Sequence, residues 1–567
     1  MLSLTRLQDY RTTAYRRAGN SPQFLDRMNL KMRSATSNRL RPLQIVFFAA
    51  LSFYLSAASA AAQTVAPRIV PANPSASLEK RADLNLQAAK ANPLALRHFL
   101  LTMPKGADLH NHLSGAVYAE SWIRAAVEDH LCVDPQKNAF TQPLPPTPAD
   151  ASHPSCAAGQ LPASEALHKQ TLYDALVDAF SMRSFVPSSG FSGHDQFFAT
   201  FSRFREVDNR HFGEWIDEVA TRAASQNEQY LELMQTPADK QAADIAHDLG
   251  WHNDMASLRD EILKRGIAED ISHAKSALDQ AEALRRQREH CADSDAAPAC
   301  QIEVRYLCQV LRGFSPETVF AQTLFCFELA SVDPRYVGIN FVMPEDGYTS
   351  MNDYALQMRM LGFLHDLYPK IHISLHAGEL IPGLVPYEGL CCHIRQAVEQ
   401  AHAERIGHGV DIMYEDRPHE LLKQMAAQHV MVEISLTSND VILGVSGKDH
   451  PFPIYRQFHV PVALATDDEG VSRIDLTHEY VRAVETYNLT YSDLKQMVRT
   501  GMEHTFLSGA SLWAAADVFT RLAPPCAKDS PASAKPSSPC QTFLNANEKA
   551  RNQWLLEQRF RAFESSL

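Results

Sequence analysis

The sequence predicts an α/β fold, a closed (β/α)8 barrel, on the strength of two observations. Eight strand-like apolar segments alternate with amphipathic stretches from residue 107 almost to the end of the chain. Histidines and acidic residues stand at the ends of several of these segments, where barrel enzymes keep their sites. An open sheet of six or seven strands is the alternative, and the count of eight favours the barrel.

Each expected strand is a short apolar run, as is typical of parallel strands buried on both faces. The eight runs are residues 107–113, 229–234, 302–311, 336–342, 371–377, 405–410, 430–436 and 462–466. Helical periodicity between them predicts crossovers that include residues 213–225, 316–330, 353–367, 392–403, 415–428 and 454–458. Residues 78–101 are expected to form one or two further helices before the first strand.

The N-terminal region has the pattern of an export signal. Residues 43–58 form a short apolar run behind Arg39 and Arg41, and the small residues that follow fit a cleavage site. An uncleaved anchor is the alternative, but the run is slightly short for a membrane span. We expect a secreted or periplasmic protein with no stable membrane association after cleavage.

The chain is expected to divide into four parts. They are a leader and secretory signal (1–62), a partly helical N-terminal extension (63–102), the barrel (103–525) and a low-complexity linker with a C-terminal helix (526–567). More than a hundred residues separate the first two strands, which predicts an insertion at about 128–205. Its aromatic stretch, 185–204, is expected to form a lid or substrate wall, or else to pack the inserted helices onto the barrel.

The charge balance of the chain argues against nucleic-acid binding, and its cysteine content indicates an oxidising compartment. Without its first 42 residues the chain has 44 basic and 64 acidic side chains, so nucleic-acid binding is not expected to be its main role. The ten cysteines suit an oxidising compartment. Three pairs flank short loops and are expected to form disulfides, namely Cys132/Cys156, Cys291/Cys300 and Cys526/Cys540. Four others in apolar surroundings are expected to be buried thiols, namely Cys308, Cys326, Cys391 and Cys392.

Four residues at strand ends form a candidate metal site. His110 and His112 lie two apart on the first expected strand, so both imidazoles can face one ion. His376 ends a later apolar run, and Asp467 follows the last one. Three imidazoles and one carboxylate suit zinc and leave a position for water, whose pKa zinc lowers to about 7. Each residue alone could be structural, but together they predict one Zn²⁺ per chain.

Three neighbouring groups are candidates for proton transfer and substrate binding. Glu379 follows the His376 segment closely, and a partly desolvated pocket would raise its pKa so that it donates a proton near neutral pH. A stabilising role at a helix N-terminus is the alternative. His408 lies between two glycines and can orient or deprotonate a water. Asp468 adjoins Asp467, and adjacent carboxylates repel without a cation, so one suits a ligand and the other a hydrogen-bond acceptor for the substrate.

The chain resembles the adenosine deaminase family of the amidohydrolase superfamily from about residue 103 to 507. The resemblance rests on Met103-Pro-Lys-Gly-Ala-Asp-Leu-His-Asn-His-Leu-Ser-Gly-Ala, Ser374-Leu-His-Ala-Gly-Glu, Arg405-Ile-Gly-His-Gly, Ser435-Leu-Thr-Ser-Asn and Ala465-Thr-Asp-Asp. The export signal and the Cys-flanked insertion are similar to the secreted adenosine deaminase-related growth factor branch. The segment before the barrel is short for that branch, which leaves a homodimer as an open alternative.

The resemblance implies a zinc-bearing TIM barrel of the metal-dependent hydrolase type. Such an enzyme converts adenosine and 2'-deoxyadenosine to inosine and 2'-deoxyinosine, with release of ammonia. The implied roles are zinc ligation by His110, His112, His376 and Asp467, protonation of purine N1 by Glu379, retention of the attacking hydroxide by His408 and a hydrogen bond from Asp468 to N7.

Three positions depart from the family pattern, and all three are expected to lie at the substrate. Ser114 stands where many members have an aspartate that contacts the ribose. Asn340 and Met343 occupy the fourth-strand region, where an aspartate and a glycine are common. Met343 keeps the backbone N–H that this glycine offers to purine N3, but its side chain crowds the site.

Other readings remain open at this stage. The chain could be another mononuclear zinc amidohydrolase acting on a different aminopurine or a cyclic amide. Residues 336–346 contain no lysine to bridge two metals, and the P-C-x-x-C motif of cytidine-type deaminases is absent. A non-catalytic secreted binding or signalling protein on the same barrel is the remaining class.

Overall fold

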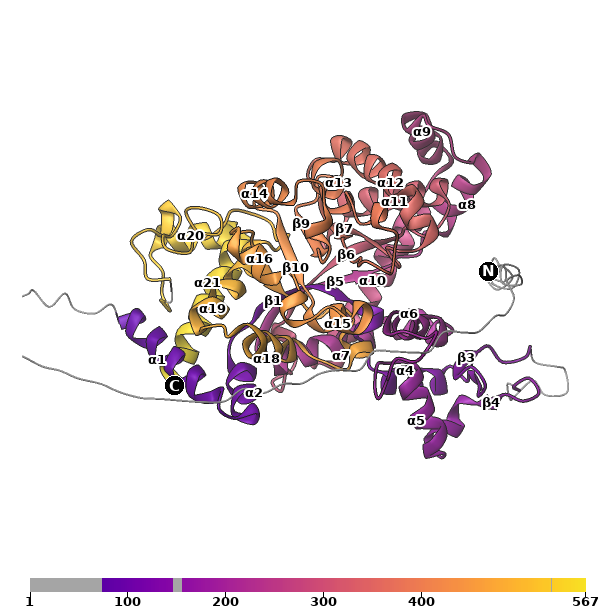
Figure 1. Cartoon of the computed structure of the whole chain (residues 1–567), viewed down its shortest axis with the longest axis horizontal. Helices are drawn as coiled ribbons and strands as arrows, with labels where there is room; N and C mark the ends of the chain where they lie inside the picture. Colours follow the sequence, from indigo (N-terminus) through magenta and orange to yellow (C-terminus); the bar gives the residue numbers. More distant parts are fainter. Residues whose placement is uncertain (1–73, 146–154, 532) are drawn as a thin grey trace, which may run out of the picture. The chain divides into compact units, whose positions relative to one another are not determined.

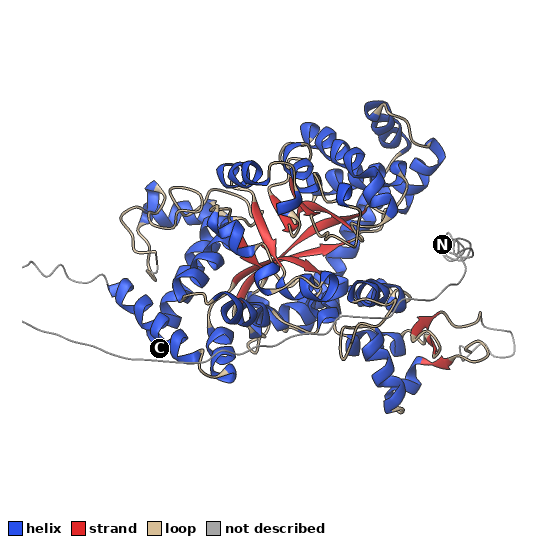
Figure 2. Cartoon of the chain, viewed as in Figure 1, coloured by secondary structure: helices blue, strands red, loops and turns tan. Residues whose placement is uncertain are grey.

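The computed structural model describes residues 74–145, 155–531 and 533–567, so the predicted leader and signal lie outside the described residues. Eight strands form the central sheet, at the places that the sequence predicts. They are β1 (Gly106–His112), β5 (Glu228–Gln235), β6 (Glu303–Leu311), β7 (Tyr336–Val342), β8 (His372–Ala377), β9 (Arg405–His408), β10 (Met431–Ile434) and β11 (Val462–Leu464). The eight strands lie at the centre with helices around them (Figure 2).

The strands follow one another in chain order, and all paired neighbours are parallel. The two ends of the sheet meet at a parallel bridge between Asn111 and Asp467. His112 N–H donates to the Asp467 carbonyl at 3.1 Å, and Asp467 N–H donates to the His110 carbonyl at 2.8 Å. These contacts close the sheet, so the predicted barrel is confirmed.

Helices connect the strands and cover the barrel (Figure 1). They are α7 (Phe212–Ser225), α8 (Lys240–Leu249), α9 (Met255–Arg265), α10 (Ala268–Arg288), α11 (Pro316–Val332), α12 (Tyr348–Leu367), α13 (His393–Glu399), α14 (Pro418–Gln428), α15 (Leu436–Leu443), α16 (Phe452–Gln457), α17 (Glu469–Ser472), α18 (Leu476–Tyr487) and α19 (Tyr491–Glu503). Helix α14 begins three residues later than expected, at Pro418, because proline suits the first helical position, where its missing N–H has no partner to lose.

The insertion between β1 and β5 folds into helices and a small antiparallel sheet. Its elements are α3 (Leu113–Ala116), α4 (Ala119–Glu128), β2 (Cys132–Asp134), β3 (Ala139–Thr141), β4 (Leu161–Pro162), α5 (Gln170–Ala179) and α6 (Gly193–Phe204). Phe204 of α6 stacks on Trp122 of α4 at 4.4 Å, while Phe198 and Phe201 line the cavity described below. Helix α6 therefore serves both expected purposes, packing and a cavity wall.

The two ends of the described chain pack together. The segment before the barrel forms α1 (Pro74–Ala89) and α2 (Pro93–Thr102), and the C-terminal segment forms α20 (Ser538–Ala546) and α21 (Glu548–Ser566). The expected single C-terminal helix is thus divided at Asn547. The Arg81 guanidinium donates to the Glu564 carbonyl at 2.6 Å, and Lys495 of α19 pairs with the Glu564 carboxylate at 2.6 Å.

All ten cysteines are paired. The three predicted disulfides, Cys132–Cys156, Cys291–Cys300 and Cys526–Cys540, are present. The prediction of four buried thiols is wrong, because Cys308 pairs with Cys326 and Cys391 with Cys392. Cys308 lies on β6 and Cys326 on α11. The apolar residues around each cysteine in the sequence do not show that the chain brings the two together.

Among the described residues, no helix combines the length and apolar character needed to span a membrane.

A buried ion-pair network connects three strands of the barrel. Arg405, the first residue of β9, is fully buried and pairs with Glu232 of β5 at 2.6 Å and with Glu433 of β10 at 2.7 Å. The guanidinium also lies 3.8 Å from the ring centroid of Phe506. One cation thus compensates two buried carboxylates on two other strands.

We predict that Arg405→Leu lowers the free energy of unfolding by about 3–5 kcal/mol, because it removes the buried guanidinium that compensates the charges of both carboxylates. Urea denaturation measures this. The control Arg551→Leu removes a half-exposed cation whose carboxylate partner is 3.7 Å away, and it should cost less than about 1 kcal/mol. Equal effects of the two substitutions would contradict the prediction.

Candidate metal centre and substrate cavity

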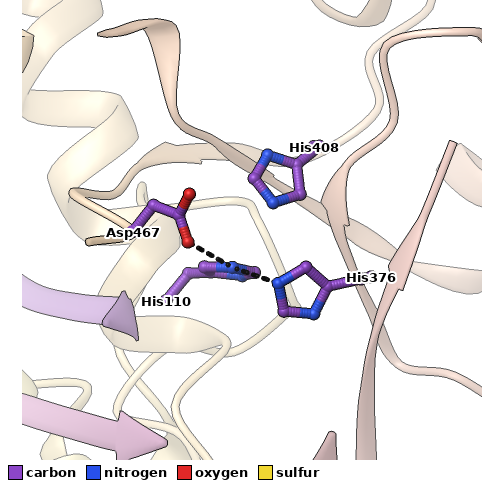
Figure 3. A group of neighbouring side chains, drawn as sticks. All are labelled: His110, His376, His408 and Asp467. Atoms are coloured by element: carbon purple, nitrogen blue, oxygen red, sulfur yellow. Dashed lines mark hydrogen bonds and ion pairs between the residues drawn. The ribbon is translucent and has the colours of Figure 1, made fainter. Parts of the chain in front are cut away.

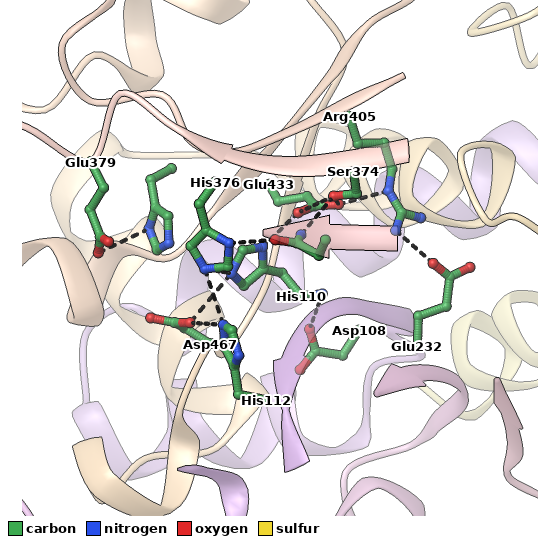
Figure 4. A network of polar contacts seen from close by, with 12 residues as sticks. Asp108, His110, His112, Glu232, Ser374, His376, Glu379, Arg405, Glu433 and Asp467 are labelled. Carbon is green, nitrogen blue, oxygen red and sulfur yellow. Dashed lines mark hydrogen bonds and ion pairs between the residues drawn. The ribbon is translucent and has the colours of Figure 1, made fainter. Parts of the chain in front are cut away.

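Four side chains converge at the carboxyl ends of three strands. His110 and His112 belong to β1, His376 belongs to β8, and Asp467 follows β11; all four are buried. The Nε2 atoms of His110 and His112 each lie 3.1 Å from Nε2 of His376. The same two atoms lie 3.3 and 3.2 Å from Oδ1 of Asp467. The structure thus brings the predicted ligands together around one point (Figure 4).

These separations fit a zinc ion. Ligand atoms held about 2.0 Å from a tetrahedral zinc are about 3.3 Å apart, close to the distances in this cluster. Imidazole nitrogens and a carboxylate oxygen that all face one another in a buried site are a set of atoms that a shared cation stabilises. Asp467 Oδ1 has no hydrogen-bond partner, whereas its Oδ2 accepts a bond from Ser438 Oγ at 2.6 Å. The donor set is therefore suited to a metal.

The outer nitrogens of two histidines face acceptors. His110 Nδ1 lies 2.6 Å from the Glu433 carboxylate, and His376 Nδ1 lies 2.6 Å from the Asn340 carboxamide oxygen. Each Nδ1 therefore carries the proton, which leaves each Nε2 with a free lone pair for a metal. Asn340 is fully buried behind His376 and does not line the cavity, although the sequence placed it among the substrate contacts.

The third histidine has a different outer partner. The Gln309 carboxamide of β6 lies 2.7 Å from His112 Nδ1, and it accepts a hydrogen bond from Thr236 Oγ1 at 3.1 Å. A threonine hydroxyl can also accept, so a reversed amide would present its oxygen to His112 equally well. This contact fixes the orientation of the ring and is compatible with a ligand.

Glu379 lies beside the cluster of candidate metal ligands. It follows Gly378, whose φ of 76° turns the chain back over the cavity at the end of β8. Burial, together with the charges of Asp467 and Glu345, raises the pKa of its carboxyl well above the usual value. Its Oε1 is buried with no hydrogen-bond partner and lies 3.7 Å from His408 Nδ1. A protonated carboxyl at this place can donate a proton into the cavity.

The loop that carries Glu379 is held by Glu345, which the sequence did not indicate. Its carboxylate accepts bonds from the N–H groups of Gly378 and Glu379, at 3.0 and 2.7 Å, and from His393 Nδ1 at 2.6 Å. Although burial opposes ionisation, the bond from His393 lowers the pKa of Glu345 to about 2. A permanent negative charge thus fixes the backbone of Glu379 and discourages ionisation of its side chain.

His408 completes the cluster from the last residue of β9. Its ring points toward His110, His376 and Asp467 (Figure 3). Burial lowers its pKa to about 3, so the imidazole is neutral. Its Nδ1 lies 3.0 Å from the Asn439 carboxamide nitrogen, and its buried Nε2 has no hydrogen-bond partner.

Asp468 also reaches the cavity. Burial and the adjacent Asp467 charge raise its pKa well above the usual value, and Oδ1 lacks a hydrogen-bond partner. A Cβ at Gly115 would lie 1.5 Å from this oxygen, so only glycine lets α3 approach so closely. The short helix after the first two ligands therefore packs directly over the carboxylate.

A cavity of about 390 Å³ opens onto the candidate ligand cluster. Its polar wall includes His112, His376, Glu379, Asp467 and Asp468, and Phe197, Phe198, Phe201 and Ile442 form part of its apolar wall. Ser114 and Met343 also line it. Met343 has a φ of 87°, unusual for any residue except glycine, and its methyl group packs against Gly313.

Several residues around the centre lie outside the sequence-derived set. Glu433 carried a weak signal, an acidic residue within an apolar strand segment. Asn439 ends one of the quoted motifs, but nothing assigned it a role. Glu345 and Gln309 carried no signal, because their partners are distant in sequence.

The sequence signature of one known family matches more than half of the chain. It is described as adenosine deaminase and matches residues 193–514. An adenosine deaminase of Clostridium perfringens (strain 13 / Type A) is 33% identical over 137 residues, which is 24% of this chain and 38% of that protein. The matched region is therefore less than two thirds of that relative's length.

Two solved structures were also similar. An adenine deaminase from Arthrobacter aurescens aligns with a TM-score of 0.46 and 17% identity, covering 71% of this chain and 94% of that one. An N6-mAMP deaminase of arabidopsis aligns with a TM-score of 0.45 and 20% identity, covering 72% and 95%.

The backbone of Met343 gives a prediction about stability. Because a left-handed φ costs a residue with a Cβ about 1–2 kcal/mol, Met343→Gly should be more stable than Met343→Ala by about 1 kcal/mol. Urea denaturation of the two variants, which both lose the thioether packing, measures the difference. An alanine variant as stable as the glycine variant would show that this conformation is not strained.

Proposed function

This chain belongs to the adenosine deaminase family, and we propose that it is an exported, zinc-dependent hydrolase that deaminates adenosine and 2'-deoxyadenosine. The observation that carries the proposal is the convergence of three imidazoles and a carboxylate, a carboxyl of raised pKa and a second carboxyl on one cavity. The ligands are His110, His112, His376 and Asp467, and the two carboxyls are Glu379 and Asp468.

The four ligands would hold one zinc ion. When bound, zinc supplies the Lewis acidity that makes a water nucleophilic at neutral pH. Glu433 and Asn340 keep the lone pairs of His110 and His376 directed at that ion, as their Nδ1 contacts require. Ser438 leaves one oxygen of Asp467 free for coordination.

Glu379 is proposed as the general acid. Its raised pKa keeps the carboxyl protonated near neutral pH, so it can transfer a proton to purine N1 and make C6 electrophilic. The oxygen of the attacking water then bonds to C6, and the bond from C6 to the amino nitrogen breaks. Of the two water protons, one joins the amino group, which leaves as ammonia, and the other returns to the Glu379 carboxylate. The product carries a carbonyl oxygen in place of the amino group.

Asp468 is proposed to orient the purine. Purine N7 has a lone pair and no proton, so it needs a hydrogen-bond donor. The raised pKa of Asp468 favours a protonated carboxyl that is able to donate, and Asp468 lines the cavity. Ser114 and the N–H of Met343 line the same cavity and are proposed to contact the sugar and the purine edge.

Export is the remaining part of the proposal. Five disulfides join all ten cysteines, and such a density is favoured in oxidising compartments. The apolar run at 43–58 supplies an export signal.

We expect the exported protein to begin at Ala61 or Gln63, after either small-residue site. N-terminal sequencing of protein from the medium and from the periplasmic fraction checks this. An intact N-terminus in all active fractions would contradict signal cleavage.

Activity is tested on purified mature protein with adenosine, 2'-deoxyadenosine, adenine and AMP, by ammonia release and zinc content. We expect one zinc per chain and turnover of the two nucleosides. Glu379→Gln should reduce turnover by about 10²–10⁴-fold because the amide cannot donate the proton, yet keep the zinc.

The control Glu388→Gln makes the same change on the exposed surface and should leave turnover intact. Zinc without turnover of any tested substrate would refute the deaminase and favour a binding protein. Turnover of adenine or AMP alone would assign a different aminopurine substrate. Loss of zinc from Glu379→Gln would refute the acid role.

A further inference from the structure

We propose that Asn439 and His450 are positioning residues that fix the proton of His408 on Nε2, so that this ring meets the nucleophilic water as a hydrogen-bond donor and neither binds the metal nor acts as a base. The inference rests on the proposed deaminase function and specifies the part that His408 plays in it. A chain of hydrogen bonds behind the ring carries it.

The chain begins at a backbone group whose direction cannot be reversed. Phe452 N–H donates to His450 Nδ1 at 3.1 Å, so this nitrogen is an acceptor and the His450 proton is on Nε2. That Nε2–H lies 3.0 Å from the Asn439 carboxamide oxygen. Asn439 must therefore present its oxygen to His450 and its NH₂ group to the opposite side.

The opposite side is His408. The Asn439 NH₂ group lies 3.0 Å from His408 Nδ1, so Nδ1 accepts and the proton of the neutral imidazole is on Nε2. Each of the three side chains is buried, with at most 2% of its surface exposed, so water cannot replace these contacts freely. Reversing the proton on His408 would set two donors against each other, which a buried site disfavours.

Two of the proposed ligand histidines differ from His408 in their outer partners. His110 Nδ1 faces a carboxylate and His376 Nδ1 faces a carboxamide oxygen, so both have free lone pairs on Nε2. The orientation of the second carboxamide is also fixed, because the Asn340 NH₂ group donates to Ser374 Oγ at 3.4 Å and this hydroxyl donates to Glu433. One asparagine thus makes a ligand, and the other makes a donor.

The geometry gives the donor a target. His408 Nε2 is buried, has no hydrogen-bond partner, and lies on the side of the ring that faces the ligand cluster (Figure 3). A protonated Nε2 cannot coordinate a metal or accept a proton from water. It can donate to a lone pair of the attacking oxygen and so direct another lone pair toward C6.

Asn439→Asp tests the proposal with an almost isosteric change. One carboxylate oxygen still accepts the bond from His450, while the other must accept from His408, which moves the His408 proton to Nδ1. We expect kcat to fall at least about tenfold, with KM changed less than about threefold, because binding groups are untouched. The matched control Asn488→Asp is exposed and should leave both constants unchanged.

The tautomer itself is measured by ¹⁵N NMR on histidine-labelled protein, with the His408 signals assigned by difference from His408→Gln. We expect the proton on Nε2 in the wild type and on Nδ1 in Asn439→Asp. Zinc binding gives a further readout, since His408→Gln should keep zinc and His376→Gln should lose it.

A wild-type proton on Nδ1, or equal loss of zinc from the two glutamine variants, would overturn the proposal. These readouts need no turnover, so they separate its failure from failure of the deaminase assignment. A turnover defect in Asn439→Asp with an unchanged tautomer would also count against it, since the defect would then be structural.

Discussion

The buried carboxylate of Glu433 connects the metal centre to the core of the barrel. One of its oxygens pairs with Arg405 and the other accepts from His110 Nδ1, while Ser374 donates to both. Such a charge is stable in the interior only with a partner, and Arg405 supplies it while also pairing with Glu232 across the barrel (Figure 4). The direction of the lone pair on His110 Nε2 therefore depends on the buried ion pair between Arg405 and Glu433.

Local partners also explain why neighbouring carboxyl groups at this site differ in their pKa values. The carboxylates of Glu433 and Glu345 are ionised because each has a cationic or N–H partner. Burial and the charges of neighbouring carboxylates raise the pKa values of Glu379 and Asp468 well above their usual range, which favours their protonated forms. A carboxylate is ionised where a strand end or loop offers it a hydrogen-bond donor or a cation. The two carboxyls of raised pKa line the cavity, where they can donate protons.

The sequence predicted what depends on local pattern. Parallel strands buried on both faces are apolar runs, and residues at their ends meet at one edge of the barrel, so His110, His376 and Asp467 were found from position alone. Contacts between distant residues were not predictable. Glu345 binds N–H groups more than thirty positions away, and the Cys308–Cys326 disulfide depends on how α11 returns across β6. Asn340 was assigned to the substrate because nothing in the sequence shows that its side chain points behind His376.

Two asparagines show why residue type alone does not determine a role at this centre. Asn340 and Asn439 each contact Nδ1 of a histidine in the cluster, yet one presents oxygen and the other nitrogen. The difference arises one bond further out, where Ser374 accepts from the first amide and His450 donates to the second. The orientation of each amide follows from these outer contacts. Whether a histidine of the cluster acts as a ligand, a hydrogen-bond donor or a base therefore depends on residues that touch neither metal nor substrate.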